Sequence, residues 1–249
     1  GTPESPRWLI GKGKLDEAQL VIEKVYGKEY SIKDLPEVAP ENKASVSQLF
    51  KSGYGSRMWF ITVFWTCSIV PLFAIYAFAP KILGALKLDG AMANIGSAAI
   101  TILFLVGCIA ALKFDNSMGR RKLLIHSFIW SGLALFILGL FPDSSATITL
   151  VLFSAYAIFI GGTQILQFVY PNELFPTEIR ASAVGLASSL SRIGAAIGTY
   201  LVPMSLDSLG IGNTMIIAAV ITFIGAIVSY KMAPETNSLD LHAAANLTD

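Results

Sequence analysis

Six long apolar runs separated by short polar segments dominate this chain of 249 residues. The runs cover residues 58–80, 92–114, 123–141, 147–170, 183–206 and 213–232. A helix that crosses a bilayer needs about 20 predominantly apolar residues, because each residue adds only about 1.5 Å along the axis. Every run comes close to that length. The sequence therefore predicts an all-α integral membrane protein with six transmembrane helices.

Charged residues are scarce and unevenly distributed. They make up 14% of the chain, whereas soluble domains carry about 25%. About half of them precede residue 58. We therefore expect residues 1–57 to form a cytoplasmic loop with short amphipathic helices, one of them over residues 15–25. The six-helix region at 58–232 would follow, and residues 233–249 would form a tail.

The positions of Lys and Arg predict which side of the membrane each loop faces, because cytoplasmic loops are enriched in these residues. An even number of spans places both termini on one side, together with the loops at 113–122 and 171–182. That side carries most of the cations, whereas the opposite side has only Lys81 and Lys87. We therefore expect both termini in the cytoplasm and the protein in the plasma (inner) membrane.

The composition argues against several functional classes. A net charge of +1 disfavours nucleic-acid binding, which needs a basic patch. Cys67 and Cys108 both lie in apolar runs and match neither a disulfide framework nor a metal site. The spans hold no paired acids, histidine cluster or nucleophile with a base, so we expect no enzyme, metal or cofactor. The chain lacks an initiator Met, and we expect it to be part of a longer polytopic protein.

A polar stretch from Tyr170 to Gly185 interrupts the apolar runs. Pro171 and Pro176 are expected to stop the helices on either side, because proline removes a backbone donor and restricts the residue before it. The charged residues of the stretch are Glu173, Glu178 and Arg180. We interpret the stretch as a gating hinge at the cytoplasmic end of a helical bundle.

The loop at 113–122 is a candidate partner for this hinge. It places Asp115, Arg120 and Arg121 close together, and Gly119 supplies the backbone freedom for a short turn. A guanidinium group can bind a carboxylate through two hydrogen bonds, so either arginine could hold an acid of the hinge. Simple anchoring of the loop in the cytoplasm is the alternative, but it explains neither Asp115 nor Gly119.

A few polar side chains inside the spans are candidates for binding a substrate. Arg192 lies well inside the fifth span, where a cation costs at least about 2.5 kcal/mol, so it should face the bundle interior or a water-filled cavity. It could bind an anion or couple to protons, or it could hydrogen-bond carbonyls between helices. Gln164 and Gln167 share one face of the fourth span and could bind hydroxyls or a carboxylate, or join helices.

The first span has a broken pattern. Trp65, Thr66, Ser68 and Tyr76 interrupt its apolar sequence, and Pro71 lies among them. Interrupted spans near the bilayer midplane form binding sites in transporters. We therefore predict that these four side chains line a substrate site, with ordinary packing as the alternative.

Four motifs carry a resemblance to the sugar-porter branch of the major facilitator superfamily. PESPRWL at 3–9 resembles its segment after helix six, and DNSMGRRK at 115–122 resembles its D-x-x-GRR loop between helices eight and nine. ELFPTEIR at 173–180 is similar to its E-x-x-P-T-x-x-R motif after helix ten, and PET at 234–236 resembles its segment after helix twelve. The motifs occur in the family's order and span nearly the whole chain.

The resemblance implies a central cytoplasmic loop followed by the C-terminal six-helix half of the fold, with an N-terminal six-helix half as its partner in the bilayer. It implies a secondary active transporter that moves a small polar metabolite by alternating access, with protons as the expected coupling ion. Arg120 or Arg121 would pair with Glu173. Arg180 would pair with Glu235 or with an acid of the other half, and these pairs would close the cytoplasmic mouth.

The family's hexose site is not preserved. When Tyr76 is aligned with the family's tyrosine pair, Trp65 and Thr66 replace its glutamine pair and Pro71 replaces its asparagine. The SRIGA sequence at 191–195 instead resembles bacterial metabolite and aromatic-acid proton symporters. This tilts the expected substrate toward an organic acid or sugar acid, with a sugar still open. A transporter-like sensor that binds a nutrient without moving it is the alternative function.

Overall fold

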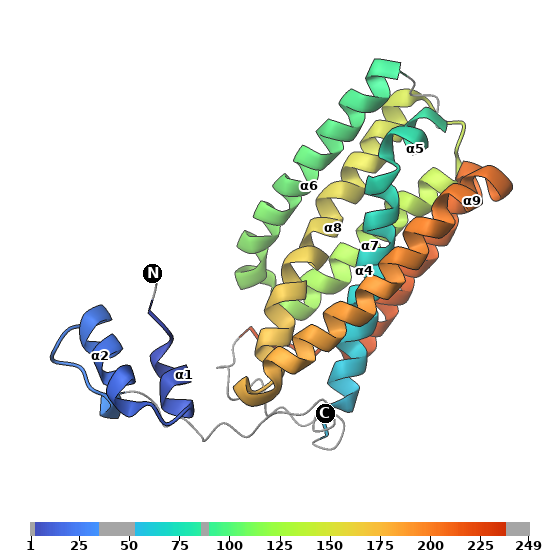
Figure 1. Ribbon diagram of the computed structural model, residues 1–249. Coiled ribbons are helices and arrows are strands. Elements are labelled where there is room, and N and C mark those ends of the chain that lie inside the picture. Colours follow the sequence, from blue (N-terminus) through green and yellow to red (C-terminus); the bar gives the residue numbers. More distant parts are fainter. Residues whose placement is uncertain (1–2, 35–52, 86–89, 238–249) are drawn as a thin grey trace. The chain divides into compact units, whose positions relative to one another are not determined.

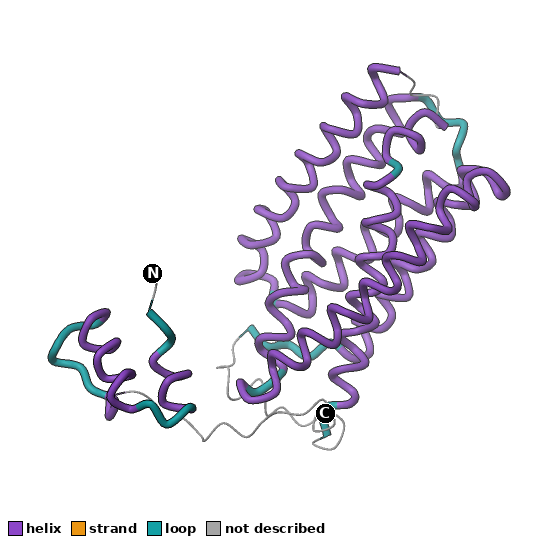
Figure 2. Tube along the Cα trace, viewed as in Figure 1, coloured by secondary structure: helices purple, strands orange, loops and turns teal. Residues whose placement is uncertain are grey.

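The computed structural model describes residues 3–34, 53–85 and 90–237, and all of the regular secondary structure in these ranges is helical (Figure 2). The chain divides into two compact units, Gly1–Ser45 and Val46–Asp249. The first unit contains α1 (Pro6–Gly11), α2 (Leu15–Val25) and the short 3-10 helix η1 (Ile32–Asp34). The second contains the long apolar helices.

The first unit is a small helical cluster. Ala18 and Ile22 of α2 are buried, and so is Leu9 of α1. Gln19 fastens the segment that follows α2, because its side-chain oxygen accepts a hydrogen bond from the Ile32 backbone at 3.1 Å. α2 covers the segment whose periodicity indicates an amphipathic helix.

The second unit is a bundle of long helices (Figure 1). Its elements are α4 (Gly55–Ala77), α5 (Ala79–Ala85), α6 (Gly90–Met118), α7 (Arg120–Leu140), α8 (Ala146–Leu174) and α9 (Thr177–Met232). Five helices of the described residues are long and apolar enough to cross a membrane. The fold class predicted from the sequence, an all-α membrane bundle, is therefore confirmed, but the count of six separate helices is not.

The difference in count arises in α9, which runs for 56 residues and contains the predicted spans at 183–206 and 213–232. Its backbone is interrupted at Gly210, where φ is 78° and ψ is 170°. Residues other than glycine hardly adopt this conformation. The hydroxyl groups of Ser205 and Thr214 lie 2.8 Å apart, whereas nine residues of straight helix would span about 13.5 Å. The chain therefore reverses at Gly210, and the two predicted spans form the two arms of α9.

The arms of α9 pack against α4 and α7. Gly194 and Gly198, whose spacing allows close helix contact, meet Thr66 and Val70 of α4, so their partner lies within this bundle. A hydrophobic core joins α4, α6, α7, α8 and the second arm of α9 through Ile75, Ile100, Leu135, Phe153 and Met215. This core includes Ile82 and Leu83 of α5, so it lies in the half of the bundle away from the helix ends that carry the polar groups described below.

The polar stretch at 170–185 is far more helical than the two prolines suggest. α8 continues through Pro171 to Leu174, and Pro176 is the N-cap of α9. Phe175 and Pro176 alone separate the two helices. Pro171 is tolerated because it lies in the last turn of α8, where it removes a single backbone hydrogen bond. The expectation that Pro171 stops the helix was therefore wrong, whereas Pro176 does mark a helix boundary.

Candidate functional site

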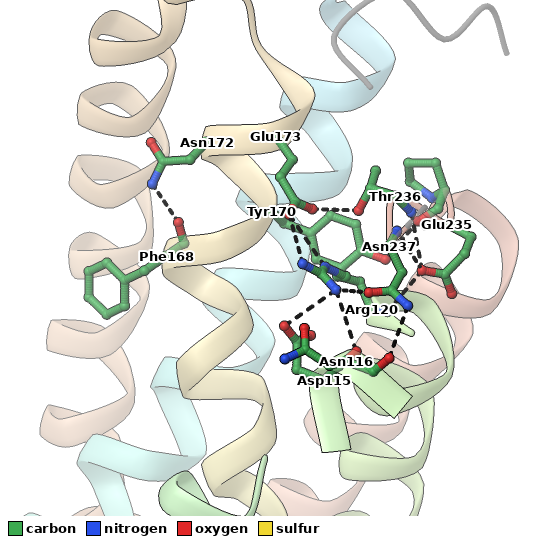
Figure 3. A network of polar contacts seen from close by, with 11 residues as sticks. Asp115, Asn116, Arg120, Phe168, Tyr170, Asn172, Glu173, Glu235, Thr236 and Asn237 are labelled. Atoms are coloured by element: carbon green, nitrogen blue, oxygen red, sulfur yellow. Dashed lines mark hydrogen bonds and ion pairs between the residues drawn. The ribbon is translucent and has the colours of Figure 1, made fainter. Parts of the chain in front are cut away.

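Arg120, the first residue of α7, interacts with the ends of several helices (Figure 3). Its Nη2 and Nε atoms lie 3.2 and 3.3 Å from one carboxylate oxygen of Glu173 on α8. Its Nη1 lies 3.6 Å from Asp115 on α6. The side chains of Arg120 and Glu173 keep only 14% and 15% of their exposure. Charges shielded from water in this way interact more strongly than those of surface ion pairs.

Glu235 is held at the N-terminus of α7. Its carboxylate accepts a hydrogen bond from the backbone N–H of Arg120 at 2.9 Å. The first N–H groups of a helix have no partner within it, and the helix dipole favours a negative charge there. Gly119 makes this approach possible, because its φ is 84° and a Cβ at this position would overlap the Glu235 carboxylate.

Residues 234–237, which we call the strap, bind the ends of three helices together (Figure 3). Tyr170 donates a hydrogen bond to the Pro234 carbonyl at 2.8 Å. Thr236 donates to Glu173, and Arg120 donates to the side-chain oxygen of Asn237. The Asn237 amide also donates to the Asn116 carbonyl at 3.2 Å. Together, Asp115, Arg120, Glu173, Glu235, Thr236 and Asn237 form what we call the Arg120 network.

The structure thus brings together Asp115, Gly119, Arg120, Glu173 and Glu235, all predicted gating residues. Arg121 lies apart from them, because its guanidinium donates to the Tyr230 carbonyl at 2.8 Å. Arg180 donates to the Phe175 carbonyl at 3.0 Å. Among the described residues neither Arg121 nor Arg180 forms an ion pair. The Glu178 side chain lies outside the part that the structure describes.

Arg57 is a polar contact that the sequence reasoning missed. Its side chain is buried at 7% exposure and donates to the Leu174 carbonyl at the C-terminus of α8, at 3.0 Å. The guanidinium also lies 5.3 Å from the Tyr54 ring. A cation is favoured at a helix C-terminus, where the last carbonyls lack partners. Only its place just before the first apolar run could have singled it out.

Among the predicted substrate residues, Ser68 on α4 and Gln167 on α8 meet. The Gln167 amide donates to the Ser68 hydroxyl at 2.5 Å, and both residues are buried. Trp65 lies one turn before Ser68 and is only 4% exposed. Its indole N–H has no hydrogen-bond partner among the described residues. Buried donors are nearly always paired, so this N–H is an unusual feature of the bundle interior.

The other predicted substrate residues on α4 and α8 make separate contacts. Thr66 donates to the Thr62 carbonyl at 2.7 Å. The Tyr76 ring packs edge-on against Phe104 at 5.6 Å, and its buried hydroxyl has no partner in the described part of the chain. The Gln164 amide lies 3.5 Å from the hydroxyl of its neighbour Thr163, and within the described residues it makes no hydrogen bond to Ser68 or Gln167.

Arg192 lies on the first arm of α9, where its side chain is exposed in this chain. Its guanidinium sits over the Phe73 ring of α4 at 5.2 Å from the centroid. It forms no ion pair within the described ranges. No three His, Cys, Asp or Glu side chains in those ranges gather to hold a metal ion. Among the described residues, Arg192 is therefore a cation without an acid partner.

Comparisons with known proteins agree with this architecture. The family model described as Sugar (and other) transporter matches residues 2–247. The chain belongs to this transporter family. YaaU of Escherichia coli (strain K12) is 42% identical over 247 residues, which are 99% of this chain and 55% of that protein. The inner membrane metabolite transport protein YgcS of the same organism is 34% identical over 247 residues, with coverages of 99% and 54%.

More distant relatives and solved structures extend the likeness. The arabinose-proton symporter of Bacillus subtilis (strain 168) is 26% identical over 255 residues, 98% of this chain and 55% of that protein. The structure of XylE, a proton:xylose symporter of the major facilitator superfamily, matches with a TM-score of 0.74 at 21% identity. The match covers 98% of this chain and 54% of the XylE chain. At this level of identity, the likeness shows that the two chains share a fold over the matched residues.

These matches confirm the resemblance to the sugar-porter branch of the major facilitator superfamily. The chain is part of an integral membrane protein, and its family consists of transporters rather than enzymes. It spans about half the length of the curated relatives that it matches. This is consistent with the expected partner, a further half of the fold.

Proposed function

We propose that the complete protein is a secondary active transporter that moves a small polar metabolite across the plasma (inner) membrane by alternating access. The substrate would be an organic acid, a sugar acid or a sugar. Membership of the transporter family supports this proposal, and so do the names of YgcS and of the arabinose-proton symporter. The substrate would bind between this half and an N-terminal half.

The observation that carries the proposal is the unpartnered Trp65 indole N–H beside the Ser68–Gln167 pair. A buried N–H without a partner costs about 1–3 kcal/mol, and a substrate oxygen would remove that cost. The Ser68–Gln167 pair offers further polar atoms on the facing helices α4 and α8. Hydroxyl-rich or carboxylate-bearing solutes have acceptors that suit such a site.

Arg192 extends the site toward anionic substrates. Its guanidinium is exposed on the bundle beside Phe73 and has no acid partner among the described residues. A carboxylate can bind a guanidinium through two parallel hydrogen bonds. We therefore favour an organic acid or sugar acid over a neutral sugar.

The Arg120 network would act as a gate at the cytoplasmic end, since the excess of Lys and Arg predicts that this end faces the cytoplasm. While the network is intact, the ends of α6, α7 and α8 are tied together by the strap. Opening toward the cytoplasm would break these contacts. Hydrogen bonds and ion pairs of this kind suit a reversible gate, because alternating access requires two states of similar free energy.

Transport is tested with the full-length protein purified into proteoliposomes and loaded with candidate solutes. Counterflow of a labelled acid or sugar into loaded vesicles is the expected result, with additional accumulation when an inward proton gradient is imposed. Saturable binding without counterflow of any bound solute would instead identify a sensor. Net uptake into solute-free vesicles that an imposed proton gradient does not increase would remove proton coupling but leave transport.

The role of Arg192 is tested by Arg192→Gln. An ion-paired hydrogen bond contributes about 1.5–3 kcal/mol, so affinity for an anionic substrate should fall by about 10- to 100-fold. A neutral analogue of the same substrate, measured in parallel by isothermal calorimetry, should lose little affinity and serves as the control. Full affinity of the variant for the anionic substrate would remove the proposed role.

A further inference from the structure

A groove on the side of the bundle has no part in the proposed transport site. It lies between α6, α7 and α8, near their ends that carry the Arg120 network, and has a volume of about 280 Å³. Its walls are mostly apolar and include Ala110, Phe114, Met118, His126, Trp130 and Phe159. All three helices are long and apolar enough to cross a membrane, so the groove opens at membrane depth.

The groove begins where α6 and α8 touch. Gly107 lies against the backbone of Ile158, and a Cβ at Gly161 would come within 2.7 Å of the Cys108 backbone nitrogen. Larger side chains could not occupy these positions without moving one helix. Small residues thus bring the two backbones together here, and the groove lies beside this contact, with α7 forming its other wall.

The wall side chains of the groove remain exposed. Trp130 is 46% exposed and Phe159 is 38% exposed, and their rings pack with centroids 6.1 Å apart. Phe114 is 52% exposed. In a membrane protein such apolar side chains are expected to contact acyl chains, and aromatic rings collect near the headgroup level.

Two exposed lysines of the groove-forming helices lie close to the wall residues, toward the Arg120 network. Lys122 lies four residues before His126 on α7 and shares its helix face, and both side chains are exposed. Lys113 lies three residues beyond Ala110 on α6 and is also exposed. Neither lysine forms an ion pair in the part of the chain that the structure describes. The nearest acid, Asp115, is buried and faces Arg120.

We propose that this groove binds one anionic phospholipid. An acyl chain would lie along the apolar walls beside Trp130, and the phosphate would lie among Lys113, Lys122 and His126. The groove and a phospholipid are both amphiphilic. The apolar walls lie at membrane depth, as acyl chains do, and the lysines lie near one end of the groove, where the headgroup would lie. Basic side chains near a membrane surface attract anionic headgroups. A zwitterionic lipid would occupy the same groove, but its headgroup has no net charge for the lysines to attract.

The test uses fluorescence quenching by brominated lipids, because Trp130 lines the groove. The full-length protein and its Trp130→Phe variant are reconstituted in phosphatidylcholine vesicles. A small fraction of either phosphatidylglycerol or phosphatidylcholine carries brominated acyl chains. The difference in emission between the two proteins reports on Trp130. Brominated phosphatidylglycerol should quench this emission at a lower mole fraction than brominated phosphatidylcholine.

The charge requirement is tested by Lys122→Gln combined with His126→Gln. Loss of a cation should lower the preference for phosphatidylglycerol by about fivefold. Lys231→Gln is the control, because Lys231 is an exposed cation on α9, a helix that forms no wall of the groove. It should leave the preference unchanged. Ala110→Phe, which fills the slot, should reduce quenching by both lipids.

Three results would overturn the proposal. Equal quenching by the two brominated lipids in the unmodified protein would mean that the groove is ordinary bilayer-facing surface. Absence of quenching by either lipid would mean that protein, such as the other half of the transporter, covers the groove. A preference that survives the double substitution would equally exclude the assigned headgroup contacts.

Discussion

At Gly119 a single hydrogen atom in place of a side chain allows Glu235 to reach the start of α7. The backbone at this residue has a φ of 84°, and the carboxylate occupies the space that a Cβ would need. Glu235 in turn accepts hydrogen bonds from the backbone N–H groups of Thr236 and Asn237, at 3.1 and 3.2 Å. The strap therefore depends on the residue type at position 119.

Gly119→Ala should destabilise the protein by at least about 1–2 kcal/mol, because alanine disfavours a positive φ and its methyl group displaces Glu235. The expected readout is a lower thermal unfolding midpoint of the purified full-length protein. Gly185→Ala is the matched control, since Gly185 lies inside α9 with open space around it. Alanine there should be neutral or stabilising by up to about 1 kcal/mol. Equal midpoints for the two variants would contradict this account.

At the scale of single elements, α8 links the two polar sites of the bundle. Gln167 holds Ser68 of α4, and Tyr170, one turn later on the same face, holds the strap through Pro234. Tyr170 is fully buried, and its ring packs against Phe60 at 5.5 Å. Its hydroxyl is therefore placed by a rigid ring rather than by a flexible chain.

Tyr170→Phe removes the hydrogen bond to Pro234 and keeps the ring. The loss should amount to about 1 kcal/mol, which corresponds to an about fivefold larger fraction of molecules with the strap open. Hydrogen exchange of the Thr236 and Asn237 amides, measured by mass spectrometry, should accelerate accordingly. Tyr200→Phe, at a side chain that is 72% exposed, is the control and should leave these amides unchanged. Unaltered exchange in Tyr170→Phe would show that the hydroxyl does not hold the strap.

The elements could be predicted from the sequence where length and hydropathy alone decide them. The apolar runs predict α4, α6, α7 and α8 because a membrane-spanning helix needs little else. Pro171 misled the prediction, because the effect of a proline depends on how near the helix end it lies. The reversal at Gly210 depends on one backbone conformation, which a pattern of apolar residues does not contain.

The sites were predictable only in part. Asp115, Arg120 and Glu173 became candidates as charged residues in an apolar chain, and Glu235 became one through the resemblance of PET at 234–236. Asn237 and the Tyr170 hydroxyl are ordinary residue types, and only the folded chain brings them to Arg120 and to Pro234. The sequence likewise indicated Ser68 and Gln167 as separate candidates. Only the folded chain shows that these two residues, which are 99 positions apart in the sequence, join α4 to α8.

At the scale of the whole molecule, the Arg120 network lies at one end of the bundle and the Lys81–Asp207 pair lies near the Gly210 turn. The latter joins α5 to α9 at 3.1 Å, with both side chains largely exposed. Exposed pairs contribute about 0–1 kcal/mol, whereas the Arg120 network is shielded and has several members. The closed arrangement of the network end should therefore depend more strongly on its charges than the opposite end does.

Glu173→Gln should shift the transporter toward the state that is open at the network end. The substitution weakens the contacts to Arg120 and to Thr236, and a loss of about 2 kcal/mol would change the ratio of the two states about 30-fold. Hydrogen exchange should then rise at residues 115–120 and 233–237 and fall at residues 78–85 and 141–145. This reciprocal pattern separates a change of state from local unfolding, which would raise exchange at the network end alone. Glu17→Gln, which removes an exposed ion pair with Lys14, is the control and should leave both ends unchanged.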